Sequence, residues 1–424
     1  MTDKSGTRKD EKHTEARIEK KEAYAIFRTK RGTGQMTQNA SRLYNELIKF
    51  GSQYSAWSDV RHLGVMVGMI ATGSVNLTKW LSHMHTKALI AQSTQRQLSR
   101  WLNNPLINPA KLYSPVIKEL IANWKEPEIY LSFDTSQLWE EYCMIRLCVV
   151  HRGRALPLCW RVIKHRSSSV EMSSYQDMLK RASKLLPVNV KVILLADRGF
   201  ANPELVRYVR ELKWQCRIRI KGNFWIYDPK HGWQTVKQLH LRLGEAKLIH
   251  NVKVHKTESK CLTDVHIAAA WESRSREYWY ILSTETTTIQ TFWEYGLRFD
   301  IEENFLDDKS NGFDLESSRL RSAPAISRLC LVVAMTTLFL TAQGLAVADS
   351  GYRRFVDPHW FRGLSYLKIG WNWIHTAITK NWAFLPSCSF SSHIDSDPSM
   401  ASRRKHYQKL FRIEFYTSTL DWAS

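Results

Sequence analysis

The sequence predicts an α/β protein with a mixed β-sheet, preceded by an all-helical region. Three observations indicate this class. Between residues 38 and 125 apolar residues recur at helical spacing, with breaks at Gly51, Gly73 and Pro105. From residue 128 onward, β-branched and aromatic runs appear that are typical of strands. Helical and strand-like segments then alternate, which favours a sheet with helices on its faces.

The strand-rich part begins with three predicted strands in succession. EIYLSFDTSQL is followed by EYCMIRLCVV, by the turn HRGR and by ALPLCWRVIKH, so the last two runs form a predicted hairpin. A helix that stops before Pro187 and the apolar strand VKVILLAD come next. A second helix, with Asn202 as N-cap and Pro203 at its first position, leads to the strand WQCRIRIKG. The order β-β-β-α-β-α-β is that of the ribonuclease-H-like fold.

The next segments are predicted to complete this core. Residues 223–285 are β-rich and basic and form a predicted insertion, and helical periodicity resumes at 289–309. The run LCLVVAMTTLFLTAQGLAVA, residues 329–348, is long enough to span a bilayer. It contains three Thr and a Gln and is the only such run, so we interpret it as a buried core helix.

The net charge points to a polyanionic partner. Lys and Arg outnumber Asp and Glu by 61 to 40, which gives a formal charge of +21. Nucleic acid and an anionic membrane surface both fit this surplus. Residues 1–127 hold a net +10 and the rest a net +11, and this spread suits a long polyanion. Arg96 and Arg100, in STQRQLSRWL, resemble a DNA-facing helix, although an ordinary solvated basic face fits equally well.

These features predict four parts of the chain and a cellular compartment. The parts are a mobile basic arm (1–37), a helical domain that is a candidate for DNA binding (38–127), an α/β core with the β-rich insertion (128–349) and a C-terminal region of unassigned role (350–424). Seven cysteines without a CxxC pair exclude zinc-ribbon spacing and favour free thiols. The N-terminal residues contain no apolar run, so we expect no secretory signal and a cytoplasmic location.

Three acidic residues occupy positions suited to a metal site on a sheet. Asp134 lies inside an apolar strand, where an unpaired carboxylate is costly to desolvate and needs a cation. Asp197 ends the strand VILLAD, at the edge where α/β sheets place ligands. Glu302 lies in the helix TFWEYGLRFDIEENFLDDKS. Carboxylates are the ligands that Mg²⁺ prefers. Taken singly, a turn role for Asp197 and a solvent-facing Glu302 are the commoner interpretations.

The helix that contains Glu302 strengthens the metal-site interpretation. Tyr295, Arg298, Glu302 and Lys309 are offset by 0, 3, 7 and 14 residues, which places them on one stripe of a regular helix. The carboxylate could hold a metal, while the guanidinium and the ammonium could bind neighbouring phosphates. An ion-pair network centred on Arg298 and Glu302 is the alternative.

The pattern Y-x2-R-x3-E-x6-K formed by these four residues resembles the signature of insertion-sequence family 4 transposases. These are DDE-type enzymes with a ribonuclease-H-like core. The segments FDTS around Asp134, LADRGF around Asp197 and RFDIEENFLDDKSNGFDLESSRLRS are also similar to segments of the family. The resemblance covers about residues 128–325, with a weaker likeness in the helical region before them.

The resemblance implies roles for individual residues. Asp134, Asp197 and Glu302 would bind two catalytic Mg²⁺ ions, for which Mn²⁺ can substitute, and the adjacent Glu303 is out of register. Tyr295, Arg298 and Lys309 would contact phosphates near a flipped end base. The family places an aromatic residue that stacks on that base in the insertion, where the candidates are Trp225, Trp233, Trp271 and Trp279. Arg319 and Arg321 in SSRLRSAP are further candidates for phosphate contact, although an ordinary surface position fits them equally well. By themselves, the tryptophans are more simply interpreted as core residues.

We therefore expect a cut-and-paste DNA transposase. The family's chemistry nicks the transposon end by hydrolysis, and the freed 3′-hydroxyl attacks the opposite strand to form a hairpin. The hairpin is resolved before the strand is transferred into target DNA. The expected partners are terminal inverted repeats and target DNA, bound by a homodimer in a bacterial cytoplasm without membrane contact. A domesticated, non-catalytic DNA-binding protein is one alternative, disfavoured by the retention of all three carboxylates. A basic membrane-associated protein built around residues 329–348 is the other.

Overall fold

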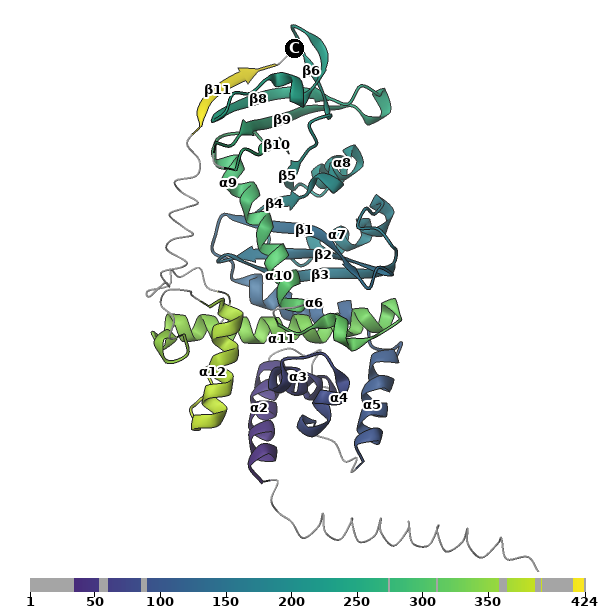
Figure 1. The fold of residues 1–424 in the computed structure, drawn as a ribbon, viewed down its shortest axis with the longest axis vertical. Helices are drawn as coiled ribbons and strands as arrows, with labels where there is room; N and C mark the ends of the chain where they lie inside the picture. Colours follow the sequence, from purple (N-terminus) through teal and green to yellow (C-terminus); the bar gives the residue numbers. More distant parts are fainter. Residues whose placement is uncertain are drawn as a thin grey trace, which may run out of the picture.

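One long mixed sheet runs through the molecule, and it confirms the predicted α/β class (Figure 1). The computed structural model describes residues 34–52, 60–84, 90–273, 275–309, 312–357, 364–385, 390 and 415–422. The expected basic arm therefore lies outside the described residues as far as residue 33, and helix α2 already begins at Gly34.

Five strands form the part of the sheet that was expected as the core. They are β1 (Glu128–Leu138), β2 (Tyr142–His151), β3 (Arg154–Lys164), β4 (Lys191–Ala196) and β5 (Gln215–Arg219). The first three form an antiparallel meander, β4 pairs parallel with β1, and β5 pairs parallel with β4. The turn between β2 and β3 is tighter than predicted, because Arg152 and Gly153 alone connect the strands, both at positive φ.

Two helices connect the parallel strands. They are α7 (Gln176–Ser183), preceded by the 3₁₀ turn η3 (Met172–Ser174), and α8 (Pro203–Glu211). The predicted start of α8 is confirmed, because the side chain of Asn202 accepts a hydrogen bond from the backbone N–H of Glu204 at 3.0 Å. Pro203 occupies the first turn, where its missing N–H leaves no helical bond unmade.

The β-rich insertion continues the sheet instead of forming a separate one. Its strands are β6 (Trp225–Asp228), β7 (Gly232–Thr235), β8 (Glu245–Val254), β9 (Leu262–Trp271) and β10 (Tyr278–Ser283). Because β10 pairs antiparallel with β5, the order along the sheet is β3-β2-β1-β4-β5-β10-β9-β8-β6-β7. Strand β11 (Tyr416–Asp421), near the C-terminus, pairs parallel with β8 at the far end of the molecule from α12 (Figure 1).

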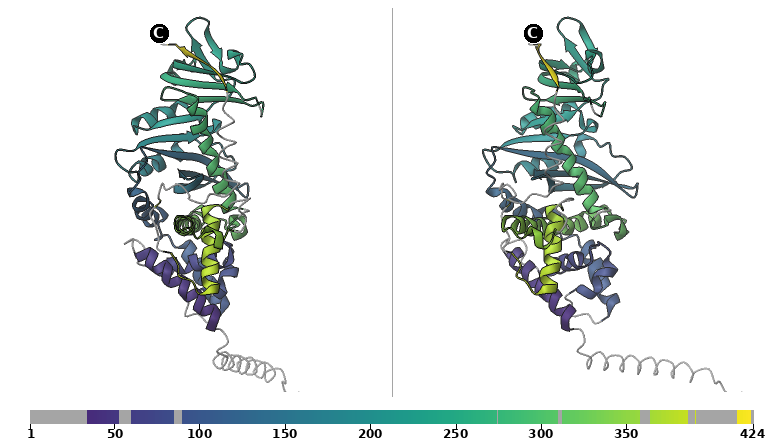
Figure 2. Two further views of the ribbon diagram at one scale, coloured as in Figure 1. Left: turned by 90° about the vertical axis from the view of Figure 1, so that its left-hand side faces the viewer. Right: turned by 60° about the vertical axis from the view of Figure 1, so that its left-hand side comes forward.

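The helix predicted over 289–309 is divided into three parts. These are α9 (Gln290–Gly296), the 3₁₀ turn η7 (Leu297–Phe299) and α10 (Asp300–Asp308). The break follows Gly296, and glycine is among the weakest helix formers. The three parts run along one face of the sheet, from the insertion strands down to α11 (Figures 1 and 2).

The apolar run at 329–348 forms part of α11 (Ala323–Asp349), and its predicted role as a buried core helix is confirmed. Its apolar window is long enough to cross a membrane but is entirely buried by the rest of the protein. Helix α12 (Tyr366–Lys380) crosses α11 so closely that a Cβ at Gly344 would overlap the carbonyl oxygen of Tyr366. The alternative of a membrane-associated protein therefore loses the segment on which it depended.

Helices also fill the described part of the region before the sheet. They are α2 (Gly34–Ser52), α3 (Val60–Thr72), α4 (Leu77–Trp80), α5 (Ala91–Asn103) and α6 (Pro109–Ala122). Helices α3, α5 and α6 pack on α11, so their apolar side chains share one continuous core with the five sheet strands. The six cysteines among the described residues are free, as the spacing predicts, and Cys388 lies outside those residues.

Candidate active site

Strand pairing brings Asp134 and Asp197 to neighbouring positions. In the parallel register of β1 and β4, Phe133 pairs with Ala196. Asp134 and Asp197 are the next residues along these two strands, at the carboxyl edge of the parallel pair. This is the edge at which α/β sheets place ligands. The two carboxylates are therefore brought together by register alone, although 63 positions separate them in the sequence.

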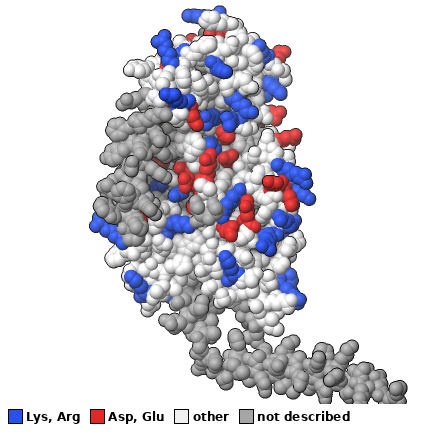
Figure 3. All heavy atoms as spheres, in the orientation of Figure 1, with Lys and Arg blue, Asp and Glu red and all other residues white. Residues whose placement is uncertain are grey.

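Arg298 connects this strand edge to α10. Its Nη1 lies 3.1 Å from Oδ2 of Asp134, and its Nη2 lies 2.6 Å from Oε1 of Glu302. The guanidinium is almost fully buried, whereas the Glu302 side chain is about half exposed. Two carboxylates from a strand and a helix thus share one positive charge. Acidic side chains gather on this face where α9 and α10 cross it, with basic side chains around them (Figure 3).

The environment of Asp134 disfavours its ionised form. Burial raises the pKa of Asp134 to about 6, and the negative charges of Asp197 and Glu302 act in the same direction. The backbone N–H of Thr135 and the guanidinium of Arg298 lower the pKa of Asp134, but they do not offset the burial. A buried carboxyl group with a raised pKa is a common feature of sites that take a proton or a cation.

Glu302 and Glu303 have different ion-pair partners. Glu302 pairs with Arg298 beside Asp134. Glu303 instead pairs with Arg154 on β3, where Oε2 lies 3.1 Å from the guanidinium. Only Glu302 therefore faces the strand edge that holds the two aspartates.

The carboxylates of Asp134, Asp197 and Glu302 are the type of side chain that binds a divalent cation. Within the described part of the chain, no three Asp, Glu, His or Cys side chains form a group able to hold a metal ion. Arg298 lies between Asp134 and Glu302 and supplies the positive charge that a cation would otherwise bring. Carboxylate oxygens are the ligands of hard cations such as Mg²⁺. Binding of a cation by these carboxylates would therefore require Arg298 to move away from them.

Of the other two residues of the predicted helix stripe, Tyr295 lies beside Arg298, whereas Lys309 lies farther along the chain at the end of α10. Tyr295 is fully buried in a small core that α9 forms on the insertion strands. Its ring packs edge-on against Trp279. Lys309 ends α10, where its Nζ donates to the carbonyl oxygen of Gln137 at 2.6 Å. Arg298 thus contacts Tyr295, Asp134 and Glu302, whereas Lys309 binds near the end of β1.

The remaining candidate phosphate contacts occupy two surfaces. Arg319 and Arg321 are exposed just before α11, and the Arg321 guanidinium lies 5.3 Å from the ring centroid of Trp139 at the tip of the β1–β2 hairpin. Arg96 and Arg100 are exposed on α5, on the far side of α11 from the sheet (Figure 1). The first pair lies near the end of the strand that holds Asp134, and the second pair lies far from it.

None of the four insertion tryptophans is fully buried, although Trp271 and Trp279 pack against core clusters. Trp225 is exposed beneath Lys256, Trp233 packs on Tyr227, and Trp271 stacks on Tyr278. Trp279 alone contacts the helix of the predicted signature, because it touches Tyr295 and Phe299. Sequence reasoning missed this distinction because it depends on how α9 packs against β10.

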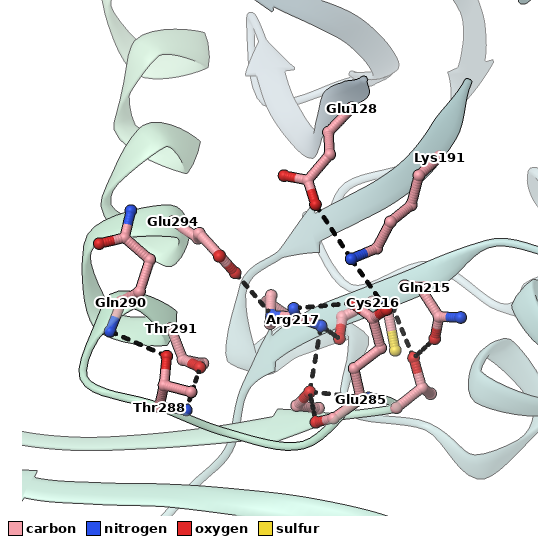
Figure 4. Close-up of polar contacts among 12 residues, drawn as sticks. Glu128, Lys191, Gln215, Cys216, Arg217, Glu285, Thr288, Gln290, Thr291 and Glu294 are labelled. Carbon is pink, nitrogen blue, oxygen red and sulfur yellow. Dashed lines mark hydrogen bonds and ion pairs between the residues drawn. The ribbon is translucent and has the colours of Figure 1, made fainter. Parts of the chain in front are cut away.

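Two buried arginines that the sequence analysis did not single out hold the helices to the sheet. Arg217 on β5 pairs with Glu294 of α9 and with Glu285, each at 3.0 Å, and Lys191 bridges Glu285 to Glu128 (Figure 4). Arg146 on β2 pairs with Asp308 of α10. A charged residue inside the apolar run EYCMIRLCVV is the same signal that identified Asp134, and it could have indicated Arg146.

Comparison with known proteins identifies a family that the chain resembles. Residues 140–339 match the family model of the transposase DDE domain, which confirms the resemblance to DDE-type transposases. The match contains Asp197 and Glu302 and begins six residues after Asp134. No curated protein matches the chain.

A solved structure of the piggyBac transposase synaptic complex with hairpin DNA is similar at 13% identity and a TM-score of 0.34. The alignment covers 70% of this chain and 60% of that one. A similarity at this level supports no conclusion about the site.

Proposed function

We propose that this protein is a DNA transposase whose ribonuclease-H-like core cuts and joins DNA with Asp134, Asp197 and Glu302. The observation that supports this most directly is that Asp134 and Asp197 occupy neighbouring strand positions at one sheet edge, with Arg298 shared between Asp134 and Glu302. The strand order β3-β2-β1-β4-β5, with β2 antiparallel, fits the ribonuclease-H-like core expected from the sequence.

The three carboxylates would hold two Mg²⁺ ions, for which Mn²⁺ can substitute. When bound, such ions activate the attacking oxygen and stabilise the leaving oxygen in phosphoryl transfer. Arg298 would then exchange its carboxylate partners for a DNA phosphate, which a planar guanidinium binds through paired hydrogen bonds. Lys309, Arg319 and Arg321 would contact neighbouring phosphates of the same DNA.

The aromatic side of the site would bind the transposon end. Tyr295 is fully buried and packs against Trp279, so Trp279 would have to move before Tyr295 could contact DNA. Because Trp279 already touches Tyr295 and Phe299, it is our candidate among the insertion tryptophans for stacking on a flipped base. We propose the hairpin route of cut-and-paste transposition on this basis.

DNA recognition would involve the helical region and a second protomer. Arg96 and Arg100 project from α5 with exposed Gln and Ser side chains beside them, which suits contact with a terminal inverted repeat. Two transposon ends must be synapsed before strand transfer into target DNA, so we propose a homodimer. A DNA-bound protein in a bacterial cytoplasm agrees with the net charge of +21.

A cleavage assay tests the proposal. The substrate is a plasmid that holds the coding sequence with its native flanking DNA, incubated with wild type, Asp134→Asn or Asp197→Asn in Mg²⁺ or EDTA. We expect wild type to cut at the element ends only with Mg²⁺. The variants should lose at least about 10³-fold in rate while still binding the DNA in gel-shift experiments. Cleavage by wild type in EDTA, or unaltered cleavage by either variant, would contradict the proposal.

A further inference from the structure

A fully buried polar cluster joins β2 to α10 on the inner side of the candidate active site. Arg146 Nη1 lies 2.5 Å from Oδ2 of Asp308 and donates to Oδ1 of Asn304 at 2.6 Å. The side chains of Arg146 and Asp308 are each 1% exposed. The Arg146 guanidinium also lies 5.2 Å from the ring centroid of Phe305, so polar and aromatic contacts both fix its position.

Strand register relates this cluster to the carboxylates. Arg146 lies directly opposite Asp134 in the antiparallel pairing of β2 and β1. Side chains directly opposite each other across such a pair project from the same face of the sheet. Arg146 therefore contacts α10 from the face on which Asp134 meets Arg298. The Arg146–Asp308 ion pair therefore lies next to Asp134, the candidate catalytic carboxylate on the neighbouring strand.

Helical geometry gives the cluster a function in orienting Glu302. At about 100° per residue, Asn304 and Asp308 lie roughly 200–240° around α10 from Glu302. Arg146 thus binds the buried side of α10 while Glu302 projects from the other side. A rotation of α10 that turned Glu302 away from Asp134 would pull Asn304 and Asp308 off the guanidinium.

The energetics of buried ion pairs favour an orienting function over a purely stabilising one. Two desolvated charges gain little over well-packed apolar side chains of the same size, and replacing both often leaves stability unchanged or higher. Two other polar links from the α10 region to the sheet are more exposed, namely Arg154 to Glu303 and Asp307, and Lys309 to Gln137. The Arg146 cluster is better shielded from water than either of them.

We infer that the Arg146–Asp308 pair, together with Asn304, is a positioning device that keeps Glu302 directed toward Asp134 and Asp197 when Arg298 leaves the carboxylates. The inference rests on the proposed function, because it assumes that these carboxylates take up a cation. Arg146, Asn304 and Asp308 touch no substrate in this account, and they act through the orientation of α10.

The test separates orientation from stability by replacing both charges together. Arg146→Met/Asp308→Leu removes the pair without leaving a buried charge, whereas Arg146→Met alone leaves Asp308 unpaired. Arg353→Met/Asp357→Leu is the matched control, because that pair is also buried but lies after α11. The three readouts are thermal unfolding, Mn²⁺ binding followed by electron paramagnetic resonance, and the Mg²⁺ concentration that gives half-maximal plasmid cleavage.

We expect the Arg146→Met/Asp308→Leu protein to unfold near the wild-type temperature and to bind Mn²⁺ about 10-fold or more weakly, the usual effect of removing a support behind metal ligands. Its half-maximal Mg²⁺ concentration should rise by a similar factor, with cleavage partly restored at high Mg²⁺. Arg146→Met alone should unfold at a lower temperature. The control pair should leave Mn²⁺ binding and cleavage at wild-type values.

Two outcomes would overturn the inference, and they are distinguishable. If wild type binds Mn²⁺ and cleaves DNA, and the Arg146→Met/Asp308→Leu protein matches it in both, the cluster does not position Glu302 although the proposed function stands. If wild type neither binds Mn²⁺ nor cleaves DNA, the proposed function fails and the positioning inference fails with it.

Discussion

The guanidinium of Arg298 lies 3.1 Å from the carboxylate of Asp134 through Nη1, and its Nη2 lies 2.6 Å from the carboxylate of Glu302. In this conformation the arginine is the counter-ion of the candidate metal ligands. A cation and Arg298 therefore compete for the same carboxylate oxygens. Arg298 should therefore weaken metal binding, whereas it should promote DNA cleavage by binding a phosphate.

The first prediction follows from that competition. Arg298→Met should bind Mn²⁺ about 3–10-fold more tightly at pH 8, because one positive charge beside the carboxylates is removed. Its cleavage rate should nevertheless fall at least about 10-fold, because the guanidinium no longer binds phosphate. Arg154→Met, which removes the partner of Glu303 only, should leave Mn²⁺ affinity unchanged. Weaker Mn²⁺ binding by Arg298→Met in calorimetric titrations would contradict the shared-charge interpretation.

The second prediction concerns pH and folding stability. Burial raises the pKa of Asp134 to about 6 from its ordinary value of 3.8. Between these values the folded protein retains a proton on Asp134 that the unfolded chain has released. The contribution of Asp134 to the free energy of unfolding therefore falls as pH rises from about 4 to about 6, and it stays low above that range.

Asp134→Asn removes this titration. The variant should be more stable than wild type by about 1–3 kcal/mol at pH 7.5, and the difference should vanish near pH 4. Urea unfolding at the two pH values measures it. An Asp134→Asn protein that is less stable than wild type at pH 7.5 would show that the ion pair with Arg298 outweighs the burial of the carboxylate.

The third prediction concerns the crossing of α11 and α12. Gly344→Ala should lower the free energy of unfolding by about 1–3 kcal/mol, because its Cβ would overlap the carbonyl oxygen of Tyr366 and the two helices would have to separate. Gly64→Ala in α3 is the control, since its Cβ would make an ordinary contact with Met84. That control should be neutral or stabilising by up to about 1 kcal/mol in urea unfolding. Equal effects of the two substitutions would argue against the close crossing.

The fourth prediction concerns the exposed face of α5. If Arg96 and Arg100 contact phosphates, Arg96→Ala/Arg100→Ala should weaken binding to DNA with the native flanking sequence. It should also reduce the slope of log affinity against log salt by about one for each phosphate that the variant no longer neutralises. Lys111→Ala/Lys118→Ala, which removes two exposed charges from α6, should leave the slope closer to wild type. Fluorescence anisotropy across a salt series would reveal an unchanged slope if α5 does not touch DNA.

Much of the fold could be predicted because apolar patterns follow secondary structure directly. The run EIYLSFDTSQL coincides with β1, and Asn202 caps α8 as expected. Asp134 and Asp197 could be placed together because parallel strands present their carboxyl ends at one edge. Glu302 could be told from Glu303 by spacing within the signature, and their different ion-pair partners agree with that distinction.

The remaining features depend on packing that no local pattern encodes. The burial of Tyr295 follows from the continuation of the sheet into the insertion, which gives α9 an apolar surface to cover. The pairing of Arg146 with Asp308 depends on how α10 is rotated over β2. A buried charge in a strand could be noticed in the sequence, but its partner could not be identified there. The sharing of Arg298 between two carboxylates is likewise visible only in three dimensions.

The most direct test of the central claim compares two neighbouring glutamates. Glu302→Gln and Glu303→Gln differ by one position on α10, remove the same charge and preserve nearly the same shape. Their Mg²⁺-dependent cleavage of the plasmid with native flanking DNA is measured beside wild type. The account predicts that Glu302→Gln loses at least about 10³-fold in rate while Glu303→Gln stays within about threefold of wild type. Cleavage by Glu302→Gln at the wild-type rate would contradict the account.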